Sequence, residues 1–211
     1  MSEVKTAVLI RTRHPRQKPT EPDATEYSYE WAGILKQQFE TSGWQVIDLA
    51  IDNAITSQVE SVLQDAKNEV VIFYGHGFPS CMIGQNLEAV INLNNMSLLK
   101  NKKVYVMACW TTQELGKKAE SVVYCYLGYN QPVSFRLDYS DYLGKCVNKG
   151  ILKMLNTDGC TFEDARQEII AEYNYWIKHF KGKGMLAHWF ATDLRENRDA
   201  LRLFGDIGAK L

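Results

Sequence analysis

The sequence predicts an α/β fold built on a mostly parallel sheet of about six strands. Short apolar runs rich in β-branched and aromatic residues alternate with segments whose apolar residues recur at helical spacing. The composition, 45% hydrophobic and 23% charged, is that of an ordinary globular protein. The 211 residues suffice for one large domain, and no repeat, low-complexity tract or linker divides them. We therefore expect a single domain over residues 1–211.

The predicted strands are the apolar runs at 6–10, 44–49, 70–74, 104–107, 122–127 and 201–206. A further apolar stretch at 87–93 fits either a short strand or a turn, and 95–99 fits a helical turn. Gly128 is expected to end the fifth strand. Since helices separate most of these runs, neighbouring strands should be parallel and joined by right-handed crossovers.

The predicted helices occupy 26–41, 56–66, 112–120, 139–155, 162–177 and 186–197. Ser42-Gly43 and Asp158-Gly159 supply stop signals for the first and fourth. Thr161 and Asp164 form a capping-box pattern, with Asp in place of Glu, at the start of the fifth.

Charge and cysteine content exclude several classes of protein. The formal net charge of −1 implies no affinity for nucleic acid or membranes driven by net charge. No apolar run reaches the length of a membrane span, and the N-terminus lacks a secretory apolar segment, so a cytoplasmic protein is expected. Five scattered cysteines without a CxxC pair predict neither a disulfide framework nor a zinc site.

Two strands each deliver one reactive side chain just past their last apolar residue. His76 follows the run at 70–74 within Gly75-His76-Gly77, and Cys109 follows the run at 104–107. If the two strands are parallel neighbours, His76 and Cys109 leave the same carboxyl edge of the sheet, where open α/β sheets place their sites. A thiol beside an imidazole is the minimal equipment for nucleophilic catalysis.

The backbone N–H groups of Gly77 and Cys109 are candidates for an oxyanion hole. Glycine on both sides of His76 permits an unusual backbone turn and a close approach by substrate. Taken singly, however, a cysteine after a buried strand is most often a core residue, and a histidine in a loop is most often incidental. The residues alone leave catalysis and core packing about equally open.

Together the two motifs resemble the paired signature of caspase-like cysteine peptidases, in which an apolar run precedes His-Gly and a second precedes Ala-Cys. The chain looks most like the bacterial CHAT-domain and gingipain-like branch: residues 122–129 resemble its strand after the nucleophile, and 159–165 resemble a helix start. Residues 203–206 resemble its closing Gly-Asp, with Ile207 in place of the usual Pro.

The resemblance implies a three-layer α/β/α sandwich and a thiol peptidase with a His76/Cys109 dyad. It further implies oxyanion donation by Gly77, protein or peptide substrates, no metal or organic cofactor, and room for a separate activator.

The chain departs from caspases in ways that bear on specificity. His76 and Cys109 are 33 residues apart, against roughly 50 in caspases. Met107 stands where caspases have Gln, so cleavage after Asp is not implied. Relatives outside the caspases cut after Arg or Lys, which makes a basic P1 residue (the residue before the scissile bond) one expectation. Acidic candidates for such a pocket are Asp138, Asp141 and Glu88.

An acidic P1 residue is the alternative, with Arg11, Arg13 and Arg136 as candidate partners. Trp110, directly after Cys109, is a further candidate substrate contact. Cys81, His179 and His188 are ranked as structural or surface residues.

Two rival functions stay open. The first is a catalytically silent caspase-like module that binds or regulates a partner, although its signature residues are intact. The second is a flavodoxin-like nucleotide-binding domain, which would need a glycine-rich turn after the first strand. Residues 11–14, Arg-Thr-Arg-His, do not provide one.

Overall fold

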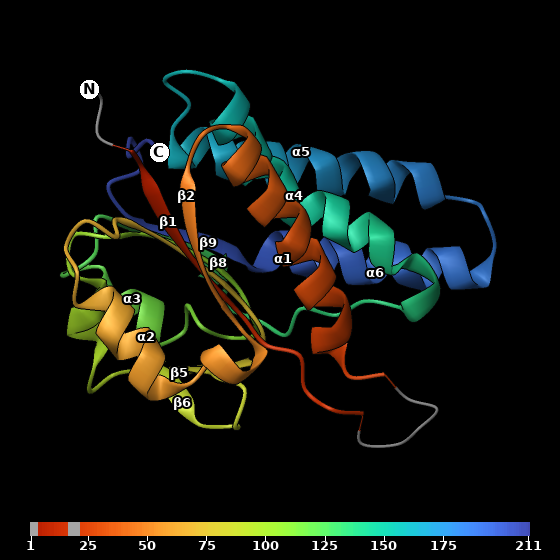
Figure 1. Ribbon diagram of the computed structural model, residues 1–211. Coiled ribbons are helices and arrows are strands. Elements are labelled where there is room, and N and C mark those ends of the chain that lie inside the picture. Colours follow the sequence, from red (N-terminus) through yellow and green to blue (C-terminus); the bar gives the residue numbers. More distant parts are fainter. Residues whose placement is uncertain (1–3, 17–21) are drawn as a thin grey trace.

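A six-stranded sheet forms the centre of the computed structural model, which describes residues 4–16 and 22–211 (Figure 1). In the order β2-β1-β3-β7-β8-β9, its strands are Gln45–Ala50, Thr6–Arg11, Val70–Tyr74, Lys103–Met107, Cys125–Tyr129 and Leu201–Gly205. Every neighbouring pair is parallel except β8 with β9. The predicted α/β class and mostly parallel sheet are confirmed.

Helices lie against both faces of this sheet (Figure 1). One face carries α1 (Ala24–Thr41), α4 (Ser140–Asn156), α5 (Phe162–Phe180) and α6 (Met185–Ala200). The other carries α2 (Thr56–Leu63) and α3 (Leu115–Ala119). The first helix, predicted at 26–41, begins two residues earlier. The predicted capping box between Thr161 and Asp164 at the start of α5 is confirmed.

Side-chain alternation along the strands explains the two covered faces. In β3, Val70, Ile72 and Tyr74 belong to the apolar cluster under α1 and α4, whereas Val71 and Phe73 belong to the cluster under α2 and α3. All five are at most 2% exposed. A strand covered on both faces has no polar alternation, which is why β3 reads as a continuous apolar run.

A second, three-stranded antiparallel sheet follows β3 and contains β4 (Gly77–Phe78), β5 (Cys81–Ile83) and β6 (Ala89–Asn92). The sequence indicated only the last of these, as a strand or turn. β4 and β5 are two and three residues long and flank the Pro79-Ser80 turn, which is too short for a periodic pattern. The helical turn predicted at 95–99 is the short 3₁₀ helix Met96–Leu99.

The predicted boundaries of the fifth strand were wrong. Residues 122–124 turn after α3, with both Val122 and Val123 N–H donating to the Ala119 carbonyl, and β8 begins only at Cys125. Gly128 does not end the strand but pairs with Arg202 inside it. Close neighbours leave room only for glycine at this position, since an added Cβ would lie 3.1 Å from the Thr112 side chain.

The third predicted helix is also shorter than expected, because the chain from 110 to 114 forms turns. The amides of Glu114 and Leu115 donate to the Pro79 carbonyl, so helix α3 begins only at Leu115. Within the described ranges, no helix is long and apolar enough to cross a membrane.

Candidate active site

The predicted pairing of the two key strands is confirmed. β3 and β7 are parallel neighbours, with Tyr74 opposite Met107, and the Gly75 amide donates to the Met107 carbonyl at 3.3 Å. His76 lies two residues beyond Tyr74, and Cys109 lies two beyond Met107. Equal offsets from paired strand ends bring the imidazole and the thiol to one place at the carboxyl edge of the sheet.

His76 and Cys109 both line one small cavity of about 30 Å³. The first turns of α1 contribute Ala24, Thr25 and Ser28, and the chain after β8 contributes Val133 and Phe135. The remaining described lining residues are Gly75, Met107 and Ala108. The cavity is therefore a narrow cleft between the sheet edge, the start of α1 and the segment that follows β8.

Cys109 is half-buried, and its sulfur accepts a hydrogen bond from the Val133 N–H at 3.3 Å. Burial raises the pKa of the Cys109 thiol above its ordinary value of 9.0, and the Val133 hydrogen bond opposes that rise. The net shift favours the thiol over the thiolate. A nucleophile in this setting needs a base to remove its proton.

His76 lines the same cleft, and its ring contacts a carboxylate. The His76 Nε2 lies 3.1 Å from Oδ1 of Asp23, and the His76 side chain is 38% exposed. His76 and Cys109, both among the described residues, form no hydrogen bond with each other. Catalytic hydrogen bonds often tighten only in the substrate complex, so this arrangement is compatible with a dyad.

Asp23 contacts His76, and nothing in the sequence singled it out. It caps α1, accepting hydrogen bonds from the Thr25 N–H at 2.8 Å and the Thr25 hydroxyl at 2.6 Å. These bonds and the neighbouring His76 outweigh burial and lower the pKa of the Asp23 carboxyl. An aspartate before a helix signals an N-cap, but no local pattern points to a histidine 53 residues away.

His14 is a second residue that the sequence did not single out. Its ring stacks on the His76 ring, with centroids 5.2 Å apart and planes 23° apart. The His14 side chain is buried and its Nε2 has no hydrogen-bond partner within the described structure. Because β1 is the other neighbour of β3, the strand-end argument applied to His76 and Cys109 also brings His14 to this edge.

We expect His14→Phe to reduce the acid sensitivity of the fold. Burial, with a smaller effect of His76, lowers the pKa of His14 below its ordinary value of 6.5, and Asp23 opposes this. The unfolded chain therefore binds this proton first, and the free energy of unfolding falls as the pH drops from about 6.5 towards the folded-state pKa. Phenylalanine keeps the stack and removes the titration.

Urea unfolding between pH 7.5 and 5.5 would measure this effect. Wild type should lose more stability over this interval than His14→Phe, and the exposed-site control His188→Phe should behave as wild type. Parallel stability curves for wild type and His14→Phe would contradict the prediction.

Neither predicted oxyanion donor, Gly77 nor Cys109, has its N–H bonded to a backbone carbonyl of the described residues. Among the described residues, the Cys109 N–H has no acceptor other than its own sulfur. In the small sheet, the Ile83 N–H donates to the His76 carbonyl at 3.0 Å. Antiparallel pairs alternate, so the next pair, Gly77 with Met82, is not hydrogen-bonded and the Gly77 N–H points away from β5.

The glycines beside His76 are needed for space rather than for an unusual turn. Neither Gly75 nor Gly77 has a positive φ, which corrects the predicted backbone role. A Cβ on Gly77 would lie 2.7 Å from the Cys109 carbonyl oxygen. Trp110, directly after Cys109, has a left-handed backbone instead, with a φ of 58°.

The structure does not bring the candidate specificity residues to the cleft. Arg11 is buried and makes two hydrogen bonds to Asp48, at 2.9 and 2.7 Å, so its guanidinium serves the fold. Asp138 is exposed, and Trp110 is half-buried, and neither belongs to the cavity lining. The prediction of Arg11, Asp138 and Trp110 as substrate contacts therefore gains no support.

The other charged candidates also have different positions. The Glu88 carboxylate accepts from the Thr56 N–H at the start of α2, and Asp141 is exposed in the first turn of α4. Arg13 and Arg136 pair with Glu26 and Asp193. Of the remaining residues, Cys81 is half-buried in β5, and His179 and His188 are exposed.

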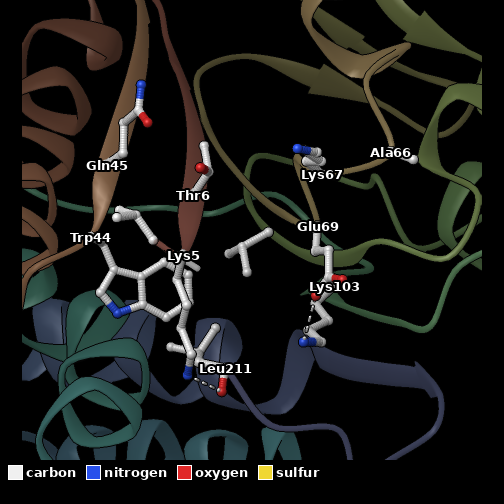
Figure 2. A pocket seen from close by; sticks show the side chains of 11 residues that line it. Lys5, Thr6, Trp44, Gln45, Ala66, Lys67, Glu69, Lys103 and Leu211 are labelled. Atoms are coloured by element: carbon white, nitrogen blue, oxygen red, sulfur yellow. Dashed lines mark hydrogen bonds and ion pairs between the residues drawn. The ribbon is translucent and has the colours of Figure 1, made fainter. Parts of the chain in front are cut away.

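A much larger cavity, of about 580 Å³, lies at the opposite edge of the sheet (Figure 2). It is lined by residues at the amino ends of four parallel strands, among them Lys5, Trp44, Glu69 and Lys103. Figure 2 shows Lys103 paired with Glu69, at 3.4 Å, and Lys5 bonded to the Leu211 carbonyl, at 3.2 Å. Since parallel sheets bind ligands at their carboxyl ends, the smaller cleft is the stronger candidate.

Brief alkylation with limiting iodoacetamide should label Cys109 first. Cys109 and Cys81 are the half-exposed thiols, whereas Cys125, Cys146 and Cys160 are buried, and burial raises the pKa of Cys125 to about 12. At Cys109 the Val133 N–H favours the thiolate, and we expect the imidazole of His76 in the same cleft to accept the proton. Peptide mass spectrometry would read the labelling, with Cys81→Ser as a control; faster labelling of Cys81 would contradict the prediction.

Comparison with known proteins leaves the site to be judged on its geometry. No protein-family model matches the chain, and no curated protein matches it.

Proposed function

We propose that this protein is a cysteine endopeptidase with a caspase-like α/β/α fold, acting on protein or peptide substrates. The observation that carries the proposal is the equal offset of His76 and Cys109 from paired strand ends, which brings them to one cleft. The N–H groups of Gly77 and Cys109, which have no backbone acceptor among the described residues, are the proposed donors for an oxyanion.

In the proposed reaction, His76 takes the Cys109 proton and the sulfur attacks the scissile carbonyl carbon. The Asp23 contact at Nε2 leaves Nδ1 as the ring nitrogen that accepts this proton. The new C–S bond forms as the carbonyl oxygen gains negative charge, which the Gly77 and Cys109 N–H groups stabilise. As the C–N bond breaks, His76 returns the proton to the leaving amine.

Water then completes the cycle. His76 removes a proton from a water molecule, whose oxygen attacks the thioester carbonyl. The C–S bond breaks, the Cys109 sulfur regains a proton from His76, and the product leaves as a carboxylic acid that releases its proton to solvent. Besides the substrate and water, each of these steps uses only residues of this chain.

The proposal is tested with a fluorogenic peptide library covering basic, acidic, apolar and small P1 residues. We expect cleavage of part of the library by wild type and none by Cys109→Ala. A peptidyl acyloxymethyl ketone should also alkylate Cys109, as shown by peptide mass spectrometry. A wild-type protein that neither cleaves peptides nor reacts with the ketones would contradict the proposal.

A silent binding or regulatory module is the second candidate. The small cleft and the pKa of Cys109, which burial raises, favour it. Under this hypothesis Cys109→Ala should bind partners as wild type does, with neither protein showing cleavage. A separate activator that opens the cleft would restore cleavage to wild type alone.

A further inference from the structure

We propose that the cleft beside Cys109 receives the P1 side chain and accepts small uncharged residues, namely glycine, alanine or serine. This inference rests on the proposed peptidase function and names its substrate class. It departs from both the basic and the acidic preference expected from sequence, because the charged candidates lie elsewhere.

The size of the cavity limits what it can hold. Its volume of about 30 Å³ is about two to three times the roughly 10–15 Å³ that a cavity needs to hold one water molecule. A methyl or hydroxymethyl group fits such a space, whereas a leucine or arginine side chain does not. Phe135 forms one wall, and edge contacts hold it to Tyr27 and Trp31, at centroid distances of 5.5 and 5.3 Å.

The lining of the cavity is uncharged. Apart from His76 and Cys109 themselves, the described lining residues carry no ionisable side chain. Ser28 and Met107 contribute a hydroxyl and a thioether, and both are at most 7% exposed. A charged P1 group would lose its hydration here without gaining a partner, which is unfavourable for an ion.

The nearest carboxylate, Asp23, is already engaged. Its oxygens accept from the Thr25 amide and hydroxyl, at 2.8 and 2.6 Å, and lie 3.1 Å from the His76 Nε2. Arg136 directly follows the lining residue Phe135, but its guanidinium pairs with Asp193, at 3.2 Å, and lies over the Trp189 ring. Neither charge is available to pair with a substrate in the cleft.

The test compares peptidyl acyloxymethyl ketones that are identical except at P1. Alanine, serine and glycine reagents should label Cys109 of the full chain at least about tenfold faster than leucine, arginine, lysine or aspartate reagents. The matching fluorogenic peptides should show the same order in kcat/KM. Faster labelling by a charged reagent would overturn the inference while leaving the peptidase proposal standing.

Variants of the residues that line the cavity test whether the P1 side chain binds there. Ser28→Asp adds a carboxylate and should raise the rate ratio of a short cationic P1 side chain, that of 2,3-diaminopropionate, to alanine about tenfold, whereas the uncharged, similarly shaped Ser28→Asn should not. If Ser28→Asp does not fold, Met107→Ala provides the second test. It should enlarge the cleft and admit leucine, with Met107→Leu as its control.

The outcomes separate the two proposals. An unchanged rate ratio in a folded Ser28→Asp, together with unchanged leucine labelling in Met107→Ala, would show that P1 binds elsewhere. Failure of every reagent and every peptide would instead overturn the peptidase function, and the specificity inference with it.

Discussion

Cys109→Ala should abolish peptide cleavage and leave the fold intact. The variant removes one sulfur from a half-buried position at the end of the core, so we expect a stability cost of about 1 kcal/mol or less. Activity should fall by roughly 10⁴-fold or more, because no second thiol is among the described residues that line the cleft. Steady-state cleavage and urea unfolding of the same preparation would measure both effects.

Cys81→Ser is the matched control for Cys109→Ala. It alters the other half-exposed thiol, outside the cavity lining, and should retain wild-type activity. Residual cleavage above about one per cent in Cys109→Ala would show that a different nucleophile acts. A cleavage-free wild type with unchanged partner binding in Cys109→Ala would support the silent module instead.

His76→Ala should reduce kcat/KM nearly as much as Cys109→Ala, by roughly 10³-fold or more. The raised pKa of Cys109 keeps the thiol protonated at neutral pH, so the reaction depends on a base beside it. In the double variant the further loss should be small, because residues that act as one unit are not additive. An additive double variant would show that His76 acts independently of the thiol.

Asp23→Asn separates orientation from proton transfer. The amide keeps the size of the side chain and its cap on α1, but it no longer offers a charge to the His76 ring. We expect a loss of roughly 10–10³-fold in kcat, with KM little changed and the pH profile shifted. The exposed control Asp138→Asn should leave kcat unchanged; a loss confined to Tm would assign Asp23 a capping role alone.

The sequence by itself determined the two strands that end beside His76 and Cys109. The runs at 70–74 and 104–107 are apolar on both faces because helices cover both, and this pattern is local in the chain. Reactive residues two positions beyond each run then predict one shared edge, and β3 and β7 confirm that they are neighbours. The capping box at Thr161 was predictable for the same reason, since its bonds join residues three apart.

Local patterns failed where long-range bonds set the boundaries. The fifth strand begins at Cys125 rather than residue 122 because the amides of Tyr124 and Cys125 donate to Lys102, across the sheet. Gly128, which reads as a strand breaker, is fixed inside β8 by its pairing with β9. Such hydrogen bonds join residues far apart in sequence, so no window of neighbouring residues contains them.

The surroundings of the dyad were decided only by the tertiary structure. Asp23 and His14 reach His76 from the chain between β1 and α1, and the Val133 amide reaches the Cys109 sulfur from beyond β8. Their side chains give no sign of these contacts in sequence, because an aspartate at a helix start and a valine in a loop each have an ordinary local role. The sequence predicts which groups can react, whereas packing of the sheet edge against α1 and the segment after β8 decides what surrounds them.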